Sequence, residues 1–316
     1  MDFGAAEAQA LARLLSAAIE EDLGPDGLDV TTAASLGSLA APIGTWVFAA
    51  RQPGVICGLA ALDAIAQAFG GLLSVALLTR DGQPVEAGQS VAQWRGPADL
   101  ALRAERTALN LIGRLSGIAT LTRRYVDTLA GTGCAVYDTR KTTPGLRVLE
   151  KYAVRCGGGV NHRMGLHDAL LLKDNHLAMA SESVQRQGLT AWVAGVVERA
   201  RALNPSLAFV EAEADRLDQV EALLGAPVDV ILLDNMPPGV MRNAVALRNR
   251  LAPKVQLESS GGLNLETVRA AAEAGVDRVA IGALTHSAVV LDVGLDDASD
   301  HASDDAPDSA PDSPPG

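Results

Sequence analysis

The second half of this 316-residue chain alternates short strand-like runs with helical stretches. The predicted strands cover residues 135–138, 169–173, 208–213, 228–234, 255–258 and 278–282. A polar residue or glycine stands at or just after the carboxyl end of each: Asp138, Lys173, Glu213, Asp234, Ser260 and Gly282. This alternation predicts parallel βαβ units, in either a doubly wound sheet or a (β/α) barrel. In a barrel those ends converge on one mouth, where the chemistry lies. The placement of the polar residues therefore favours a barrel.

The first part of the chain, residues 1–115, has a different pattern. Its amino-terminal segment predicts an amphipathic helix with Leu11, Leu14, Leu15, Ala18 and Ile19 on one face. Four β-prone runs follow, over residues 45–50, 54–57, 73–79 and 90–94. Two helices are predicted in the same part, over residues 58–69 and 98–115. We therefore expect a mixed α/β domain over residues 1–115 and a barrel domain over 116–295, from which a late segment can pack back on the first domain.

The end of the chain, residues 296–316, contains seven Asp, no Lys or Arg and no large apolar side chain. Such a segment cannot bury enough surface to offset its ordering entropy, so we expect a disordered tail. The chain carries a net charge of -12, which disfavours nucleic-acid binding. It has no run of 18 apolar residues, no secretory signal at its start and no CxxC pair among its three Cys. These features predict a cytoplasmic protein without a membrane span.

Lys and Arg are concentrated between residues 140 and 173, although the chain as a whole is acidic. This stretch has seven Lys or Arg and two acidic residues, a net charge of +5. A small anionic ligand in a cleft accounts for such an excess. A solvated basic helix face is the alternative for Arg147, Lys151 and Arg155, which recur every four residues. It is the weaker explanation for the cations that flank turn-like Thr-Thr-Pro-Gly and Gly-Gly-Gly segments: Arg140, Lys141, His162 and Arg163.

The same region carries motifs that resemble a known family. DTRKTTPG at 138–145, NHRMGL at 161–166 and KDNH at 173–176 are similar to the signature of quinolinate phosphoribosyltransferases, also called carboxylating nicotinate-nucleotide pyrophosphorylases. Supporting motifs are EDLGPDGLDVTT, ERTALN, RLSGIAT, LLDNM, ESSGG and IGALTHS, so the similarity extends over residues 21–292. The resemblance implies an N-terminal α/β sandwich followed by an incomplete (β/α) barrel.

The resemblance also implies roles for the cations. Five of them would hold the two carboxylates of quinolinate: Arg140, Lys141, His162, Arg163 and Lys173. Lys141 and Lys173 would also lie near phosphoribosyl pyrophosphate. Arg offers a carboxylate a two-pronged donor and Lys a point charge, so the residue types suit a dianion. The family further implies a homodimer in which Arg106, in ERTALN, reaches the neighbouring subunit's site; surface pairing on a helix is the alternative for this arginine.

Two acidic residues, Glu213 and Asp234, end adjacent predicted strands. They are candidates to bind Mg²⁺, which prefers carboxylate, water and phosphate oxygens. Glu211 is a rival on the same strand face, and structural ion pairing is the alternative reading of Glu213 and Asp234. The resemblance assigns the latter two to the metal and to the ribose and pyrophosphate, so that with Lys141 they are the expected catalytic residues.

Glycine-rich loops follow the last two predicted strands. Backbone amides in such loops can bind an anion, and late barrel loops are the usual phosphate position. The resemblance assigns the 5-phosphate to Ser260, Gly261, Gly262, Gly282 and Ala283. His286, in IGALTHS, has no settled role and is expected to be either supporting or structural.

Two places depart from the family pattern. His167 stands where an aromatic residue is expected and would add a cation near the site. Ile112-Gly113 replaces a bulkier pair, and Gly113 is expected to weaken its helix by about 1 kcal/mol relative to Ala. The chain has no Walker lysine motif and no GxGxxG after a strand, so neither ATP nor dinucleotide binding is supported.

The sequence therefore predicts Mg²⁺-dependent transfer of a phosphoribosyl group from phosphoribosyl pyrophosphate to quinolinate. Decarboxylation would give nicotinate mononucleotide, pyrophosphate and CO₂, in de novo NAD biosynthesis. One alternative is a paralogue with a changed substrate, such as the molybdenum-transport-associated relatives of this family. A second is a non-catalytic binding protein on the same scaffold. The intact motifs argue against the first, and the presence of Lys141, Glu213 and Asp234 argues against the second.

Overall fold

The structure is a computed structural model and describes residues 2–36 and 40–298. The chain forms two compact units. One comprises residues 3–116 and the segment from Val290 onward, and the other comprises residues 117–289. The expected start of the tail at residue 296 is wrong by two residues, because strand β12, Val293–Asp297, includes Asp296 and Asp297. The predicted tail from residue 299 lies outside the described residues.

The N-terminal unit contains a four-stranded sheet in the order β12-β1-β5-β3. Strand β1, Ile43–Ala50, pairs antiparallel with β12 and with β5, Ser90–Pro97, which in turn pairs with β3, Ser74–Leu77. The rings of Phe48 and Trp94 meet edge to face at 4.8 Å in the core. The short strands β2 and β4 form a separate pair, Gly54–Val55 with Pro84–Val85. β4 and β12 were not predicted, because a two-residue strand and a strand of mixed polarity leave little sequence signal.

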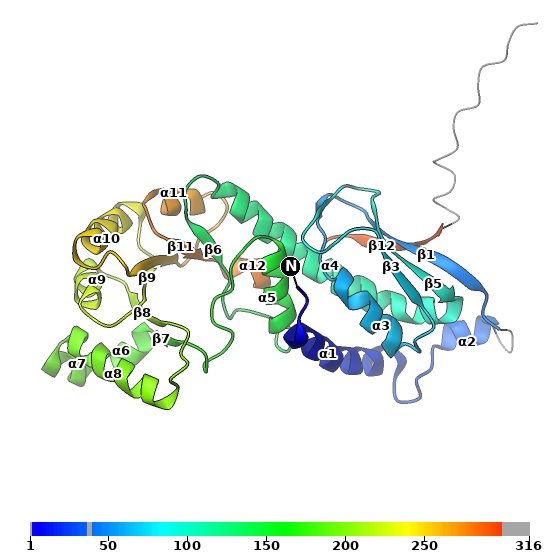
Figure 1. Cartoon of the computed structure of the whole chain (residues 1–316), viewed down its shortest axis with the longest axis horizontal. Helices are drawn as coiled ribbons and strands as arrows, with labels where there is room; N and C mark the ends of the chain where they lie inside the picture. Colours follow the sequence, from blue (N-terminus) through cyan, green and yellow to red (C-terminus); the bar gives the residue numbers. More distant parts are fainter. Residues whose placement is uncertain (1, 37–39, 299–316) are drawn as a thin grey trace, which may run out of the picture. The chain divides into compact units, whose positions relative to one another are not determined.

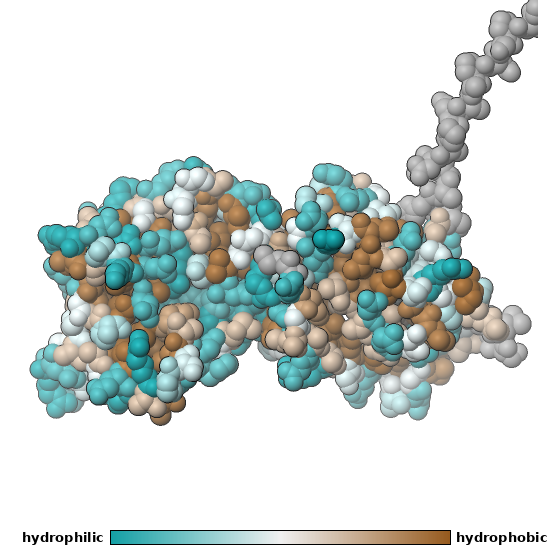
Figure 2. All heavy atoms as spheres, viewed as in Figure 1, coloured by the Kyte–Doolittle hydropathy of each residue, from teal (hydrophilic) through white to brown (hydrophobic). Residues whose placement is uncertain are grey.

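Helices accompany this sheet. They are α1 (Ala5–Leu23), α2 (Val30–Leu36), the 3₁₀ helix η1 (Leu59–Ala61), α3 (Leu62–Ala68) and α4 (Ala98–Thr128). Leu11 and Leu15 of α1 are buried, as the predicted amphipathic face requires, and Ile19 is half-buried. A groove of about 570 Å³, lined mainly by apolar side chains of α1 and α3, remains open. Figure 2 shows hydrophobic residues gathered over α3 on the visible face.

Gly113 has a packing role in α4 that the sequence did not reveal. A Cβ at this position would lie 2.8 Å from Val290 Cγ1 and 2.9 Å from the carbonyl oxygen of Leu291. The Leu291 amide donates to the Gly113 carbonyl at 3.0 Å. The returning chain therefore packs directly on the helix backbone. This close approach gives a packing reason for glycine at a position where helix propensity favours Ala.

The second unit contains a six-stranded parallel sheet in the order β6-β11-β10-β9-β8-β7. Its strands are β6 (Ala135–Tyr137), β7 (Leu170–Leu172), β8 (Val210–Ala214), β9 (Val230–Asp234), β10 (Gln256–Ser260) and β11 (Arg278–Ala280). β6 and β7 are the edges, so the barrel is incomplete. All six predicted strands are confirmed to within a few residues. Among the described helices, none has both the length and the apolar content that crossing a bilayer requires.

Helices connect these strands and lie along the outer side of the sheet (Figure 1). They are α5 (Arg147–Cys156), α6 (Asp174–Met179), α7 (Ser181–Gln187), α8 (Leu189–Leu203), α9 (Leu217–Leu224), α10 (Pro238–Leu251), α11 (Val268–Glu273) and α12 (Ala283–His286). The single helix expected over 183–203 is two helices, because Gly188 adopts a left-handed φ of 83°. The helix expected to end at residue 115 continues as α4 to Thr128.

Candidate active site

A cavity of about 710 Å³ opens at the carboxyl ends of the six parallel strands. Twelve of the sequence-predicted site residues line it: Arg140, Lys141, His162, Arg163, Lys173, Glu213, Asp234, Ser260, Gly261, Gly262, Gly282 and Ala283. Ten of these residues stand at or just after the carboxyl ends of the six strands, and His162 and Arg163 come from the loop between α5 and β7. The parallel sheet is what brings them to one place, as expected for a barrel mouth.

The cations of the cavity have little compensation from the protein. In the described part of the chain, none of Arg140, Lys141, Arg163 and Lys173 forms a salt bridge. Arg140 Nε is buried without a hydrogen-bond partner there. Burial, and next the charge of Arg140, lower the pKa of Arg163. Adjacent cations held without carboxylate partners make the cavity a receptor for an anion.

Helix α5 fixes the two loops that carry these cations. Lys151 is fully buried; its Nζ contacts the Asp138 carboxylate and donates to the His162 carbonyl at 2.9 Å. Arg147 donates to Thr142 Oγ1 and to the Met164 carbonyl, both at 3.0 Å. The solvated basic face considered for these residues and Arg155 is therefore wrong. Their charges lie inward, where they hold the cation-bearing loops.

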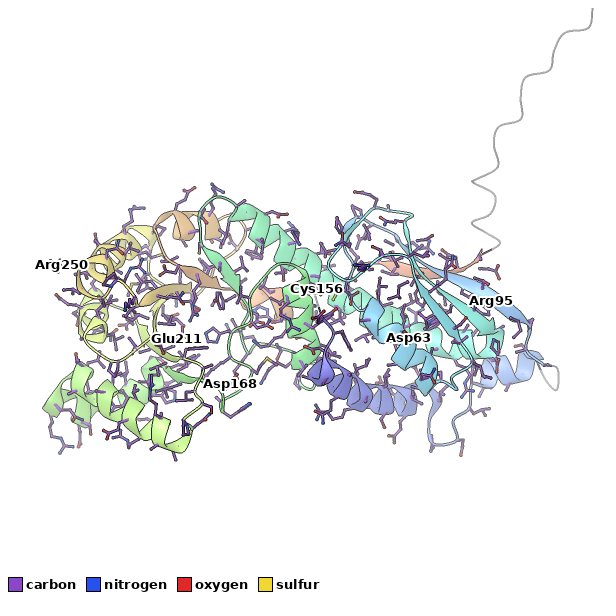
Figure 3. The ribbon with its side chains drawn as sticks, in the orientation of Figure 1. Asp63, Arg95, Cys156, Asp168, Glu211 and Arg250 are labelled. Atoms are coloured by element: carbon purple, nitrogen blue, oxygen red, sulfur yellow. The ribbon has the colours of Figure 1, made fainter. Side chains whose placement is uncertain are left out.

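A buried cluster lies at the floor of the cavity, which His162 and Glu258 help to line. His162 Nε2 is 2.8 Å from Glu211 Oε2, and Arg278 Nε is 2.8 Å from Glu258 Oε2. His162 Nδ1 accepts the Arg163 amide at 2.8 Å, so the ring proton lies on Nε2 and is donated to Glu211. Burial, then the charge of Glu211, raise the pKa of Glu258 well above its usual range. Figure 3 shows Glu211 in the interior of the unit.

This cluster places the two glutamates of β8 in different surroundings. Glu211 is fully buried and paired with His162, whereas Glu213, two residues on, lines the cavity. The three ligand atoms of His162, Glu211 and Glu258 lie close enough together to suit a metal ion. Arg278 already supplies positive charge there, since its guanidinium stands 3.6 Å from Glu211 and 2.8 Å from Glu258. The cluster is therefore a structural ion-pair network.

Glu213 and Asp234, which both line the cavity, stand on neighbouring strands, β8 and β9, as predicted. Burial, then the charges of Asp234 and Asp174, raise the pKa of Glu213. Their mutual repulsion and their oxygen donors suit a divalent cation between them, so the residues fit the predicted Mg²⁺ site.

The glycine-rich loops complete the wall of the cavity. Gly261 and Gly262 adopt left-handed φ values of 98° and 60°. A Cβ on Gly282 would meet Lys141 Cδ at 2.8 Å, and Thr285 Oγ1 donates to the Lys141 carbonyl at 2.8 Å. The lysine stem therefore lies against Gly282, which places a cation beside the predicted phosphate loop.

Comparison with known proteins agrees with this geometry. The model of the C-terminal domain of quinolinate phosphoribosyl transferase matches residues 118–296, and that of the N-terminal domain matches residues 29–116. The chain belongs to the quinolinate phosphoribosyltransferase family. It is 45% identical over 284 residues to the nicotinate-nucleotide pyrophosphorylase [carboxylating] of Mycobacterium leprae, covering 88% of this chain and 94% of the relative.

Two further comparisons extend the likeness. A probable nicotinate-nucleotide pyrophosphorylase [carboxylating] of Bacillus subtilis is 38% identical over 248 residues, which are 78% of this chain and 81% of the relative. The solved structure of the nicotinate-nucleotide pyrophosphorylase from Francisella tularensis superposes with a TM-score of 0.81 at 33% identity, covering 91% of this chain and 96% of that one. Both units of this phosphoribosyltransferase thus have counterparts in the family.

The sequence analysis considered three further residues for the site, namely Arg106, His167 and His286. Arg106 belongs to the N-terminal unit, where its side chain is 65% exposed and 3.9 Å from Glu105. Its role across a dimer interface stays a prediction. His167 is exposed and does not line the cavity, so the structure gives no support for an added cation there. His286 does line it, with Nδ1 2.7 Å from Ser287 Oγ.

Sequence reasoning missed three polar residues of the cavity wall. They are Thr139, Asn235 and Glu258. Thr139 and Asn235 directly follow residues that were singled out at strand ends, so their positions in DTRK and LLDN could have indicated them. Glu258 lies inside its strand, and only the packing of β10 beside β11 decides that its partner is Arg278.

Proposed function

We propose that the protein transfers a phosphoribosyl group from Mg²⁺-bound phosphoribosyl pyrophosphate to quinolinate and releases CO₂, giving nicotinate mononucleotide and pyrophosphate for NAD biosynthesis. The single observation that carries the proposal is the cavity itself. Four cations that form no salt bridge with the described residues share one space of about 710 Å³ with the carboxylates of Glu213 and Asp234. A pyridine dicarboxylate and a phosphorylated sugar diphosphate need those two kinds of surface.

The cations would bind the acceptor. Arg140 and Arg163 offer planar donors that match carboxylates, while Lys141 and Lys173 offer point charges. Each carboxylate of quinolinate then meets a cation that the protein itself leaves uncompensated. Because α5 fixes the loops that carry Arg140, Lys141 and Arg163, the ring is held with its nitrogen in a set direction, which favours attack on the ribose.

Glu213 and Asp234 would hold Mg²⁺ and the ribose hydroxyls. When bound, the ion supplies positive charge to the departing pyrophosphate. The amides of Ser260–Gly262 and of Gly282–Ala283 would bind the 5-phosphate, and Lys141, lying against Gly282, would add a cation beside it. These fixed charges stabilise an oxocarbenium-like ribose and its leaving group as the bond between them breaks.

The acceptor nitrogen then bonds to ribose C1, which makes the ring cationic. The bond from ring C2 to its carboxylate breaks, the electron pair stays on C2, CO₂ departs and C2 takes up a proton. The ring charge stabilises that carbanion, so no strong base is needed. The protein's work is positioning and charge stabilisation.

The test is pyrophosphate release with quinolinate, with nicotinate and with no acceptor. Quinolinate should be preferred strongly, because an unpaired buried cation costs about 2–5 kcal/mol and nicotinate lacks one carboxylate. Equal efficiency with the two acids would contradict a dicarboxylate site. Activity with neither acid would favour the substrate-changed paralogue, and binding without turnover would favour a non-catalytic protein.

We also propose a homodimer in which Arg106 of each subunit completes the site of its partner, with the protein acting in the cytoplasm. The support for the first part is the exposed guanidinium of Arg106 and its place in ERTALN. The second part rests on the sequence features given above.

A further inference from the structure

Asn235 combines two features that seldom occur together. It directly follows Asp234 at the end of β9 and lines the cavity. It is also the one non-glycine residue with a positive φ, 52°, in residues 2–36 and 40–298. L-residues avoid this left-handed region, and Asn is among the few that enter it at modest cost. A left-handed residue directly after a carboxylate of the cavity calls for a functional explanation.

The side chain of Asn235 supplies one. Its Nδ2 donates to Asp234 Oδ2 at 2.9 Å. Elsewhere in the described chain, no group donates a hydrogen bond to the Asp234 side chain. One oxygen of the carboxylate is thereby fixed by the neighbouring amide, and Oδ1 remains available to a ligand in the cavity.

The side-chain oxygen of Asn235, Oδ1, lies against Gly261 in the Ser260–Gly262 loop. A Cβ on Gly261 would lie 2.2 Å from Asn235 Oδ1, far inside contact distance. The amide therefore fills the space that the absent side chain of Gly261 leaves. The backbone amide of Asn235 also donates to the Ser260 carbonyl at 3.0 Å. Asn235 thus touches both the carboxylate of β9 and the loop after β10.

We propose that Asn235 is a positioning residue that orients the Asp234 carboxylate and ties it to the Ser260–Gly262 loop, so that the metal-bound diphosphate and the 5-phosphate of one ligand are received in fixed register. Both contacts depend on the left-handed φ of Asn235, because this backbone conformation turns the side-chain amide back onto Asp234 and over Gly261. The inference rests on the proposed function, because it assigns those two groups to phosphoribosyl pyrophosphate.

The test separates the backbone from the amide. Asn235→Gly keeps the left-handed conformation and removes only the amide, whereas Asn235→Ala removes the amide and leaves a residue that resists this φ. Calorimetric titration with phosphoribosyl pyrophosphate and Mg²⁺, with no acceptor present, should show binding weakened about 10- to 100-fold in both variants, as expected when a supporting hydrogen bond is lost. Quinolinate titrated alone should bind as in the wild type. Asn235→Ala should melt below Asn235→Gly.

A double-mutant cycle tests the contact with the loop. Gly261→Ala places a methyl group on the Asn235 amide, so it should lower the melting temperature more in the wild type than in the Asn235→Gly background. The strain of Gly261 itself, at φ 98°, is common to both and cancels. Equal losses in the two backgrounds would show that the amide does not lie over Gly261.

The outcomes keep this inference distinct from the proposed function. Wild-type affinity for the diphosphate in folded Asn235→Gly would overturn the positioning role, and so would an equal loss of both ligands. A wild type that binds phosphoribosyl pyrophosphate but does not convert quinolinate would overturn the function and leave the role intact. A wild type that fails to bind it overturns both. Asn243→Ala, an exposed amide on α10, is the matched control and should match the wild type throughout.

Discussion

The barrel unit has two layers of charged residues, and they differ in whether the charges are paired. In the lower layer, Asp138 is paired with Lys151 and Glu258 with Arg278, all at most 5% exposed. In the upper layer, Arg140, Lys141, Arg163 and Lys173 have no carboxylate partners among the described residues. On β8 a single step of two residues separates the layers, about 7 Å along a strand.

This difference in pairing indicates that one layer stabilises the fold and the other binds ligand. A buried charge without a partner is strongly destabilising, so the lower layer is paired and fixes the geometry. The upper layer opens to a cavity, where charges can remain uncompensated until a ligand arrives. Substitutions below should therefore cost stability, and substitutions above should cost activity.

The largest effect is expected for Lys151→Met. It leaves the buried Asp138 carboxylate without its cation and should destabilise the fold by about 3–5 kcal/mol, measured by denaturant unfolding. Adding Asp138→Asn should restore part of the loss, because the Asn oxygen can still accept the hydrogen bond that the His162 amide donates to Asp138 Oδ1 at 2.8 Å. The exposed Lys254→Met is the control. A fully stable Lys151→Met protein would break the distinction between the layers.

Lys141→Ala should have the reverse signature. Removing a charge-stabilising donor from the cavity should lower kcat about 100- to 1,000-fold. The melting temperature should stay near that of the wild type, since the exposed lysine has no salt bridge to lose. Steady-state rates and thermal unfolding check the two parts. Retention of more than about a tenth of the activity would remove Lys141 from the catalytic role proposed for it.

Arg106 tests whether the upper layer of one site is formed by a single chain or needs a residue of the partner subunit. Arg106→Ala and Lys141→Ala should each be nearly inactive alone. Co-folded, half the dimers should be mixed, and one site in each mixed dimer should be intact, so about a quarter of wild-type activity should return. Native mass spectrometry counts the mixed dimers. Mixed dimers without recovered activity would place Arg106 outside a shared site.

The smallest effect concerns Glu213, the upper-layer acid. Burial, then Asp234 and Asp174, raise its pKa. A carboxyl whose pKa is raised by folding favours the fold at low pH, and that contribution is lost as pH rises through the folded pKa. At neutral pH the ionised group therefore opposes folding, and Glu213→Gln should raise the melting temperature of metal-free protein. The gain should shrink near pH 4.

Chelator-treated protein should be used for that comparison, so that bound cations do not mask the repulsion. Glu221→Gln, at an exposed position of α9, is the matched control and should leave the melting temperature unchanged at both pH values. A lower melting temperature for Glu213→Gln at pH 7 would show that the carboxylate is stabilising, which would contradict an upper layer left uncompensated.

Much of the barrel could be predicted because its signals are local. Each strand is a short apolar run, and each ends at a polar residue or glycine that the parallel sheet brings to one edge. Lys173, Glu213, Asp234, Ser260 and Gly282 follow from that rule, whereas Arg140, Lys141, His162 and Arg163 were predicted from the local excess of cations and from the motifs. The break at Gly188 and the extension of α4 to Thr128 were missed, since helix ends depend on a few weak local preferences.

The sequence by itself determined which residues stand at the strand ends and that cations exceed acids around them. Only the tertiary structure decided the partners. Periodicity placed Arg147 and Lys151 on one helix face, and packing of α5 against two loops turned that face inward. Glu211 and Glu213 share a strand face and a residue type; the depth of each beneath the strand end separates them. Partner choice depends on burial and on contacts between distant segments, such as residues 138 and 151 or 211 and 278, which no local pattern records.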